Sequence, residues 1–235
     1  MPLRTVLHNV NSSNKHDVLV IFDLDSTIFD VSPRTEEILK RFSKDNEVST
    51  KFPNECKILE NVEVLSSDWG IFEPIRRLKI SSTIDFFHII QDYWRTHFFS
   101  NDFLHFDKPY EGSIEYILEL HNSGAKISYL TGRDQHRMGE GTKKILIDWG
   151  LPLDEEHILY LKPQKGMSDS KFKLDIIKDL TSDYKEVWLF ENEPVNTDLI
   201  EKELPEVQIV FVDSVHSGRS VTPEHLPQIK TKFHW

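Results

Sequence analysis

Two carboxylates separated by one residue carry the strongest chemical signal in this sequence. Asp23 and Asp25 directly follow an apolar run, residues 18–22, that is rich in β-branched side chains. Successive residues of an extended chain point to opposite sides, so both carboxylates are expected on one side if that geometry continues. Carboxylates this close repel each other unless a cation or a shared proton relieves the repulsion. The pair therefore suits a Mg²⁺ site in which one acid attacks as a nucleophile and the other transfers protons.

The elements that must position this pair are predicted to form an α/β fold. Five apolar runs are predicted strands, at residues 17–22, 125–130, 157–161, 186–190 and 207–212. Helical patterns lie between them, at residues 110–122, 142–149, 171–180 and 194–204. This alternation implies right-handed crossovers and a Rossmann-like parallel sheet, which binds ligands at the carboxyl ends of its strands. We expect residues 1–15 to be a loose leader.

A long gap separates the first two predicted strands. Residues 28–108 contain helical patterns at 35–42 and 82–99 and a cluster of aromatic side chains. A gap of this size is too long to be a loop. We therefore expect an α/β core at 1–30 and 105–235 and a small, mainly α-helical cap at 31–104. Most of the aromatic side chains should form the cap's own core, with a minority lining the substrate cleft.

A second candidate site lies where the second predicted strand ends, at Thr131 and Gly132. The threonine hydroxyl and the backbone N–H groups of a glycine turn can bind phosphate oxygens. The alternative is a polar strand-to-helix turn with no ligand. Two weaker candidates are residues 138–142, which look like a turn and helix start, and residues 213–219. The latter follow the fifth strand and form either a surface turn or a substrate contact through His216 and Arg219.

These motifs resemble those of the haloacid dehalogenase-like superfamily. The segment Asp23-Leu24-Asp25-Ser26-Thr27 after an apolar strand is similar to the first superfamily motif, and Thr131 matches the second. The resemblance covers residues 17–30 and 108–213 but not the insertion. It implies a Mg²⁺-dependent reaction at Asp23, with Thr131 and Gly132 binding phosphate.

The resemblance also implies a lysine at the start of the helix before the fourth strand. This lysine would neutralise the nucleophile and the phosphoryl oxygens. Lys171 and Lys173 both stand in that region. We favour Lys173, because apolar residues follow it at three, four and seven positions.

The fourth motif departs from the superfamily pattern. Glu191 and Asn192 stand where aspartate is usual, and Asn196 follows. Glutamate reaches further than aspartate, and an amide oxygen is a competent ligand for a hard cation. The resemblance then implies Mg²⁺ ligands from Asp23, Asp25 and either Asn192 or Glu191. We favour Asn192, with Glu191 a close second and Asn196 left open.

The acid at Asp25 is similar to the phosphatase and phosphomutase pattern, and unlike that of dehalogenases and ATPase pumps. By this resemblance, Asp23 forms an aspartyl-phosphate, while Asp25 protonates the leaving oxygen and then activates water. The predicted function is hydrolysis of a small phosphomonoester. A phosphomutase is the alternative enzyme. A phosphate-binding protein with little turnover is a further alternative, motivated by Glu191 and Asn192.

Composition narrows the possible partners. The chain of 235 residues has a formal net charge of -11, which argues against nucleic-acid binding. Cys56 is the single cysteine, so no intramolecular disulfide is possible, and no apolar run approaches the length of a membrane span. We expect a cytoplasmic enzyme with a small-molecule partner and no membrane partner. The oligomeric state stays open.

Overall fold

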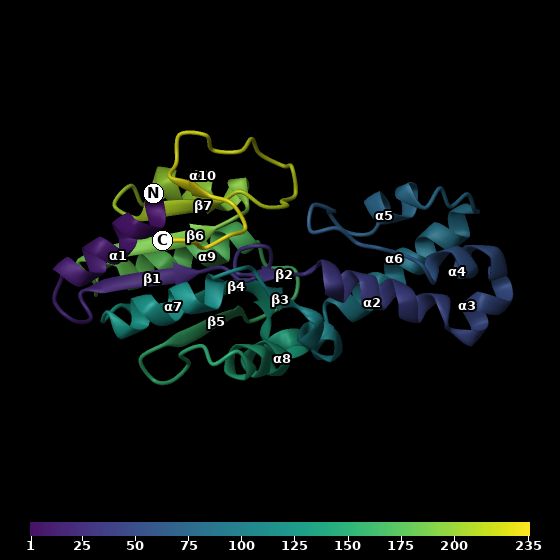
Figure 1. Ribbon diagram of the computed structural model, residues 1–235, viewed down its shortest axis with the longest axis horizontal. Helices are drawn as coiled ribbons and strands as arrows, with labels where there is room; N and C mark the ends of the chain where they lie inside the picture. Colours follow the sequence, from purple (N-terminus) through teal and green to yellow (C-terminus); the bar gives the residue numbers. More distant parts are fainter.

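The computed structural model describes residues 1–235 and has the expected α/β architecture, with a parallel sheet and helices around it (Figure 1). The six strands of the main sheet lie in the order β5-β4-β1-β6-β7-β8. Their bounds are β1 (Val18–Phe22), β4 (Lys126–Asp134), β5 (Ile158–Lys162), β6 (Glu186–Glu191), β7 (Gln208–Val212) and β8 (Gln228–Ile229). β1 pairs in parallel with β4 on one side and β6 on the other. Asp23 and Asp25 therefore leave the sheet near its centre.

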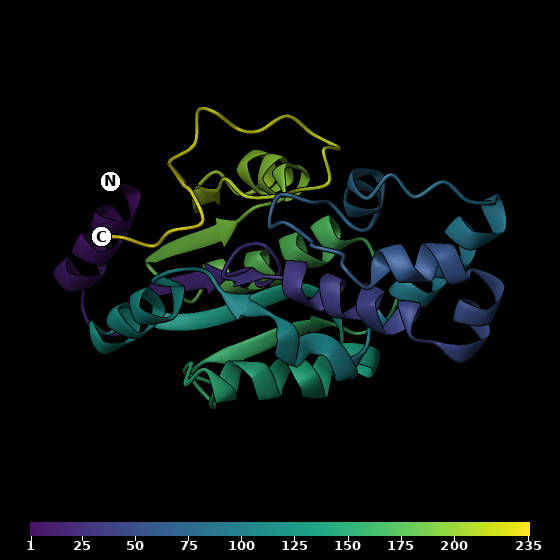
Figure 2. The same ribbon diagram turned by 45° about the vertical axis from the view of Figure 1, so that its right-hand side comes forward.

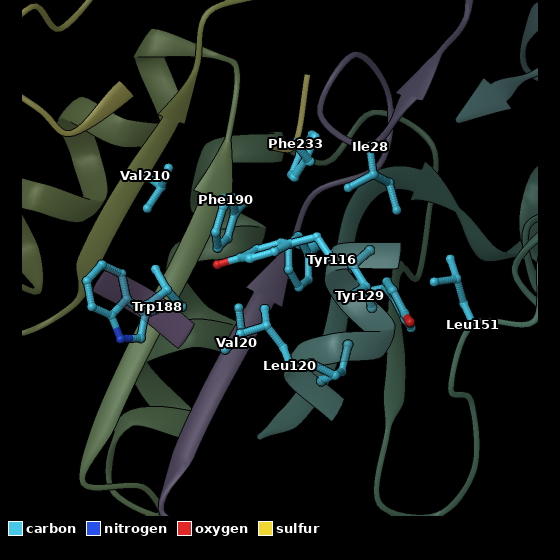
Figure 3. Packing of buried hydrophobic residues seen from close by; sticks show 14 of the residues in the cluster. Val20, Ile28, Tyr116, Leu120, Tyr129, Leu151, Trp188, Phe190, Val210 and Phe233 are labelled. Atoms are coloured by element: carbon cyan, nitrogen blue, oxygen red, sulfur yellow. The ribbon is translucent and has the colours of Figure 1, made fainter. Parts of the chain in front are cut away.

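Helices cover both faces of this sheet. An apolar cluster on one face joins the strands to α1 (Pro2–Ser12), α7 (Ser113–Asn122) and α8 (Gln135–Asp148), and Figure 3 shows Tyr116 of α7 packed near Val20 and Phe190. A second cluster joins the other face to α9 (Asp169–Thr181) and α10 (Pro194–Glu203). Along β1, Val20 belongs to the first cluster, and Leu19 and Ile21 belong to the second. This alternation follows from the two-residue period of a strand.

Five helices lie together beyond the sheet in both ribbon views (Figures 1 and 2). They are α2 (Ser32–Ser43), α3 (Asn46–Lys51), α4 (Pro53–Leu59), α5 (Phe72–Arg77) and α6 (Ile84–Phe98). They have an apolar cluster of their own, with Phe42 and Phe86 at its centre. The chain enters and leaves through an antiparallel pair, β2 (Phe29–Asp30) and β3 (Lys108–Pro109), with the 3-10 helix η1 (Asn101–Phe106) before β3. None of the helices combines the length and apolar character needed to cross a membrane.

The expectation of a loose leader at residues 1–15 is wrong. This segment forms α1, and Leu3, Val6 and Val10 are buried in the first sheet cluster. Their spacing of three and four residues is that of a helix face, although the segment is polar overall. Tertiary packing of this narrow apolar stripe, and not the average polarity, decides its structure.

Two expectations near the second motif are also wrong. Residues 138–142 are not a turn, because α8 begins at Gln135 and Asp134 caps it by accepting the backbone N–H of Arg137. The glycines inside α8 disfavour a helix and so led to a predicted start that is too late. At Gly141, close packing explains why a glycine is present. A Cβ there would lie 2.9 Å from the Asn101 carbonyl oxygen of η1. Gly132 likewise lies within β4 and not in a glycine turn.

Candidate active site

Asp23 lies at the carboxyl end of β1 with only 5% of its surface exposed. Its backbone N–H donates to the Phe190 carbonyl at 3.0 Å, which extends the pairing of β1 with β6 by one residue. Its Oδ1 accepts from Lys173 Nζ at 2.6 Å and its Oδ2 from Thr27 Oγ1 at 2.9 Å. Burial raises the pKa of Asp23 to about 7, although the ammonium group of Lys173 opposes this rise. The result is a carboxylate with little solvation and two fixed donors.

Lys173 reaches this carboxylate from the face of the sheet that α9 covers. Asp23 continues the alternation of Leu19 and Ile21, which pack against that face. Lys173 is buried and also donates to Glu191 Oε2 at 2.6 Å, whereas Lys171 is exposed at the surface. Of the two candidate lysines, the fold thus brings only Lys173 to the candidate nucleophile.

Glu191 has both carboxylate oxygens engaged within the protein. Its Oε1 accepts the backbone N–H groups of Asn192 and Glu193 at 3.1 and 3.0 Å. Its Oε2 accepts from Lys173 and from Asn196 Nδ2, the latter at 3.2 Å. The side chain is 1% exposed. Glu191 therefore pairs with Lys173 and accepts two backbone N–H groups just before α10.

Asn192 has its amide oriented by the segment after β7. Its Nδ2 donates to the Val215 carbonyl at 2.7 Å, which turns Oδ1 toward Thr27. Thr27 Oγ1 lies 3.1 Å from Asn192 Oδ1 and 2.9 Å from Asp23 Oδ2. The amide oxygen is therefore next to the candidate nucleophile.

The chemistry of these donors fits a hard divalent cation. Two buried carboxyl groups, Asp23 and Glu191, share the single positive charge of Lys173, so ionisation of both leaves one negative charge for a cation to balance. No cluster of three or more His, Cys, Asp or Glu side chains is arranged to hold a metal ion. A Mg²⁺ ion here would need oxygens of other kinds, such as the Asn192 amide and the main-chain carbonyl of Asp25, which are suitable ligands.

Asp25 is held by two arginines. Its Oδ1 accepts from Arg34 Nη2 at 2.5 Å and Arg133 Nη2 at 2.7 Å, and its Oδ2 accepts from Arg133 Nε at 3.0 Å. Desolvation opposes ionisation, but the guanidinium groups of Arg133 and Arg34 outweigh it and hold the pKa of Asp25 well below its usual range. In this arrangement Asp25 is a carboxylate and carries no proton to donate.

The same arginines share a second buried carboxylate, Asp107. Arg34 Nε lies 2.8 Å from Asp107 Oδ1, an ion pair without hydrogen-bond alignment, and Arg133 Nη2 donates to Asp107 Oδ2 at 2.7 Å. We call Asp25, Arg34, Asp107 and Arg133 the arginine–aspartate network. Neither its arginines nor Asp107 were predicted from the sequence as site residues. One signal for Arg34 was available, because it shares the buried face of α2 with Ile38.

The favoured residues for reaction, phosphate binding and metal binding line one cavity of about 750 Å³ between the carboxyl ends of the strands and the helices α2 and α6, whereas Lys171 does not. Thr131 is 1% exposed, and its Oγ1 accepts the backbone N–H of Arg133 at 3.3 Å. Gly132 lies where a Cβ would approach Asp169 Cγ to 3.0 Å, so a larger residue would crowd this wall. Ser217 and Arg219 also line the cavity, and Ser217 donates to Glu193, so residues 213–219 belong to its rim. His216 is not among the lining residues.

Comparisons with known proteins point to one family. A sequence model for "haloacid dehalogenase-like hydrolase" matches residues 20–149. A Bacillus cereus protein described as a "putative nucleotidase" is 34% identical over 76 residues, which is 32% of this chain and 36% of that protein. The match thus spans about a third of that relative's length.

Solved structures share the fold at low sequence identity. A "putative phosphatase" from Clostridium difficile has a TM-score of 0.57 at 13% identity, covering 93% of this chain and 95% of that one. A haloacid dehalogenase-like hydrolase from Streptococcus pneumoniae has a TM-score of 0.53 at 13% identity, covering 92% and 94%. These likenesses extend over almost the whole of each chain.

Proposed function

The chain belongs to the haloacid dehalogenase-like hydrolases, and on that premise we propose that it is a Mg²⁺-dependent phosphatase acting on a small phosphomonoester. The observation that carries the proposal is the buried carboxylate of Asp23, fixed between Lys173 and Thr27 at the end of the central strand. Such a group has few solvent hydrogen bonds to lose before it attacks. The description of the Bacillus cereus relative as a nucleotidase supports chemistry on a phosphate ester.

The reaction would proceed in two displacements at phosphorus. A carboxylate oxygen of Asp23 forms a bond to phosphorus while the bond to the ester oxygen breaks, and that oxygen leaves with a proton from Asp25. Asp25 then removes a proton from a water molecule, which attacks phosphorus and releases inorganic phosphate and free Asp23. Lys173 and the hydroxyl of Thr131 hold the phosphoryl oxygens, and Gly132 leaves room for them.

Asp25 can act as an acid only after its contacts with the arginines loosen, because they stabilise its charged form. Arg34 lies in the first turn of α2, shortly after β2, and Asp107 lies just before β3, so both stand where helices α2–α6 meet the sheet. We propose that residues 31–104 act as a cap on a core of residues 1–30 and 105–235. Displacement of this cap would remove Arg34 from Asp25, leave Arg133 as its remaining guanidinium partner, and so favour proton uptake by Asp25.

The residues proposed to hold Mg²⁺ are Asp23, the main-chain carbonyl of Asp25, and Asn192. A bound Mg²⁺ ion would screen the repulsion between the Asp23 carboxylate and the phosphate. Removing it with EDTA should lower phosphate release from p-nitrophenyl phosphate at least about tenfold, and excess Mg²⁺ should restore it. Turnover that is insensitive to the chelator would exclude the metal. Assaying transfer to a sugar hydroxyl in the same samples separates hydrolysis from phosphomutase activity.

Asn192 and Glu191 should respond differently to replacement. Because both oxygens of Glu191 are engaged, Asn192→Ala should raise the Mg²⁺ concentration for half-maximal activity by about tenfold or more, a shift typical of a disturbed metal site. Asn192→Asp should lower that concentration, because it adds a formal charge. Glu191→Ala should mainly lower kcat by freeing Lys173. The measurement is a Mg²⁺ titration of each variant. If both alanine variants keep the wild-type dependence, Asn196 becomes the next candidate.

A further inference from the structure

The part of the cavity formed by helices α2–α6 is lined by aromatic side chains. Trp69, Phe72, Trp94, Phe98 and Phe99 all face it. Trp69 is 53% exposed and Phe72 is 42% exposed. Large aromatic side chains usually bury most of their surface, so two that stay half exposed inside a cavity indicate a surface meant to be covered. We call these five residues the aromatic wall.

One stripe of α6 supplies the main part of this wall. Gln91, Trp94, Arg95 and Phe98 line the cavity and follow each other at helical spacing. Phe86 of the same helix instead faces the apolar cluster of α2–α6. Trp94 does both, because it packs against that cluster and donates from Nε1 to Thr35 Oγ1 at 3.3 Å while it lines the cavity.

The segment before α5 closes over this stripe. A Cβ at Gly70 would lie 4.0 Å from Cη2 of Trp94, so the backbone next to Trp69 runs against the indole ring. Gly70 has φ +73°, a conformation that favours glycine and lets the chain turn at this point. In Figure 1 this segment reaches from the helices toward the sheet. It places Trp69 and Phe72 on the wall of the same cavity as Trp94.

The guanidinium group of Arg34 lies between the aromatic wall and the candidate catalytic centre. The Cζ atom of Arg34 lies 4.0 Å from the centre of the Phe98 ring, while Nη2 of the same side chain contacts Asp25. Trp94 continues the wall, with its ring centre 4.8 Å from that of Phe98. A leaving group whose oxygen receives a proton from Asp25 would therefore have these rings nearby.

From this juxtaposition we infer that the substrate's leaving group carries a planar aromatic ring system, which stacks on the exposed ring of Trp69 within the aromatic wall. The inference rests on the proposed phosphatase function and names its substrate class. The faces of aromatic side chains stack favourably on other flat aromatic rings. Gln91 and Arg95 add polar groups at the edge of a stacked ring. Nucleoside monophosphates and simple aryl phosphates share this chemistry.

The test compares kcat/KM for adenosine and uridine monophosphates, phosphotyrosine, glucose 6-phosphate and glycerol phosphate. Aromatic substrates should exceed the two others by about tenfold or more, the scale of one good stacking contact. Trp69→Ala should raise KM for aromatic substrates by about tenfold and leave glycerol phosphate unchanged, and Trp69→Phe should restore most of the loss. Trp149→Ala is the matched control, because Trp149 is also partly exposed, at 39%, but lies outside the cavity. A preference within the aromatic set separates nucleotides from aryl phosphates.

Binding of unphosphorylated adenosine and uridine, followed by tryptophan fluorescence, keeps this inference separate from the proposed function. Quenching that is lost in Trp69→Ala, without phosphate release from any substrate, would support the aromatic site and reject the phosphatase. Phosphate release with no preference for aromatic substrates would overturn the aromatic site, as would an equal loss of kcat/KM in Trp69→Ala for all substrates. Either result would still be consistent with the proposed phosphatase function.

Discussion

Replacing Asp23 with alanine should lower phosphate release by about 10⁴-fold or more, because no other side chain is placed to form the covalent phosphoryl-enzyme. Asp23→Asn should behave alike, since an amide is a poor nucleophile but keeps the shape of the group between Lys173 and Thr27. The measurement is kcat for p-nitrophenyl phosphate at saturating Mg²⁺, with unfolding curves to show that both variants fold.

Asp25→Ala provides the informative contrast. It removes the proton carrier but not the nucleophile, so it should slow both steps and still allow phosphorylation by a substrate with a good leaving group. A phosphate-mimicking fluoride such as beryllofluoride should then bind wild type and Asp25→Ala, but not Asp23→Ala. Near-normal activity of Asp23→Ala would reject the covalent mechanism.

The parts of the site that the sequence predicted are those that follow from strand geometry. Asp23 and Glu191 stand at the ends of β1 and β6, and Thr131 lies in the last part of β4. These strands are neighbours in the sheet, so their period and order bring the three residues together. Lys173 is accessible to the same reasoning, because its apolar neighbours fix the buried face of α9. Their roles in catalysis remain predictions, as does the division into core and cap.

The arginine–aspartate network was out of reach of such local reasoning. Arg133 and Asp25 lie 108 residues apart, and Arg133 and Asp107 lie 26 apart. Arginine is usually exposed, and apart from the place of Arg34 on the buried face of α2, the burial of these arginines follows from partners that the tertiary fold supplies. The aromatic wall was missed in part for a related reason. The aromatic cluster near α6 has the composition of a core, and only the packing of the helices shows which rings remain open to the cavity.

Asp107→Ala should lower the free energy of unfolding by about 3–5 kcal/mol, the usual cost of removing one partner from a buried ion pair. Asp107 and Arg34 are fully buried and Arg133 is almost so. Burial raises the pKa of Asp107 to about 6 against the pull of both arginines, so it is ionised at pH 7.5. Its loss would leave two buried guanidinium groups with Asp25 as their single carboxylate partner. Urea unfolding at pH 7.5 measures this free energy. The control is Asp102→Ala, on the exposed side of η1, which should change the free energy of unfolding by no more than about 0.5 kcal/mol.

A double replacement shows whether charge balance is the cause. The network holds two positive and two negative charges, and removing Arg34 together with Asp107 leaves Arg133 paired with Asp25. Arg34→Met combined with Asp107→Ala should therefore lower the free energy of unfolding clearly less than the sum of the two single changes. Each single change leaves one buried charge without a partner, whereas the double change does not. If the costs simply add, lost packing and not an unbalanced charge would explain the instability. If the free energy of unfolding of Asp107→Ala lies within about 1 kcal/mol of the wild-type value, the Asp107 carboxylate is not needed to stabilise the two buried arginines.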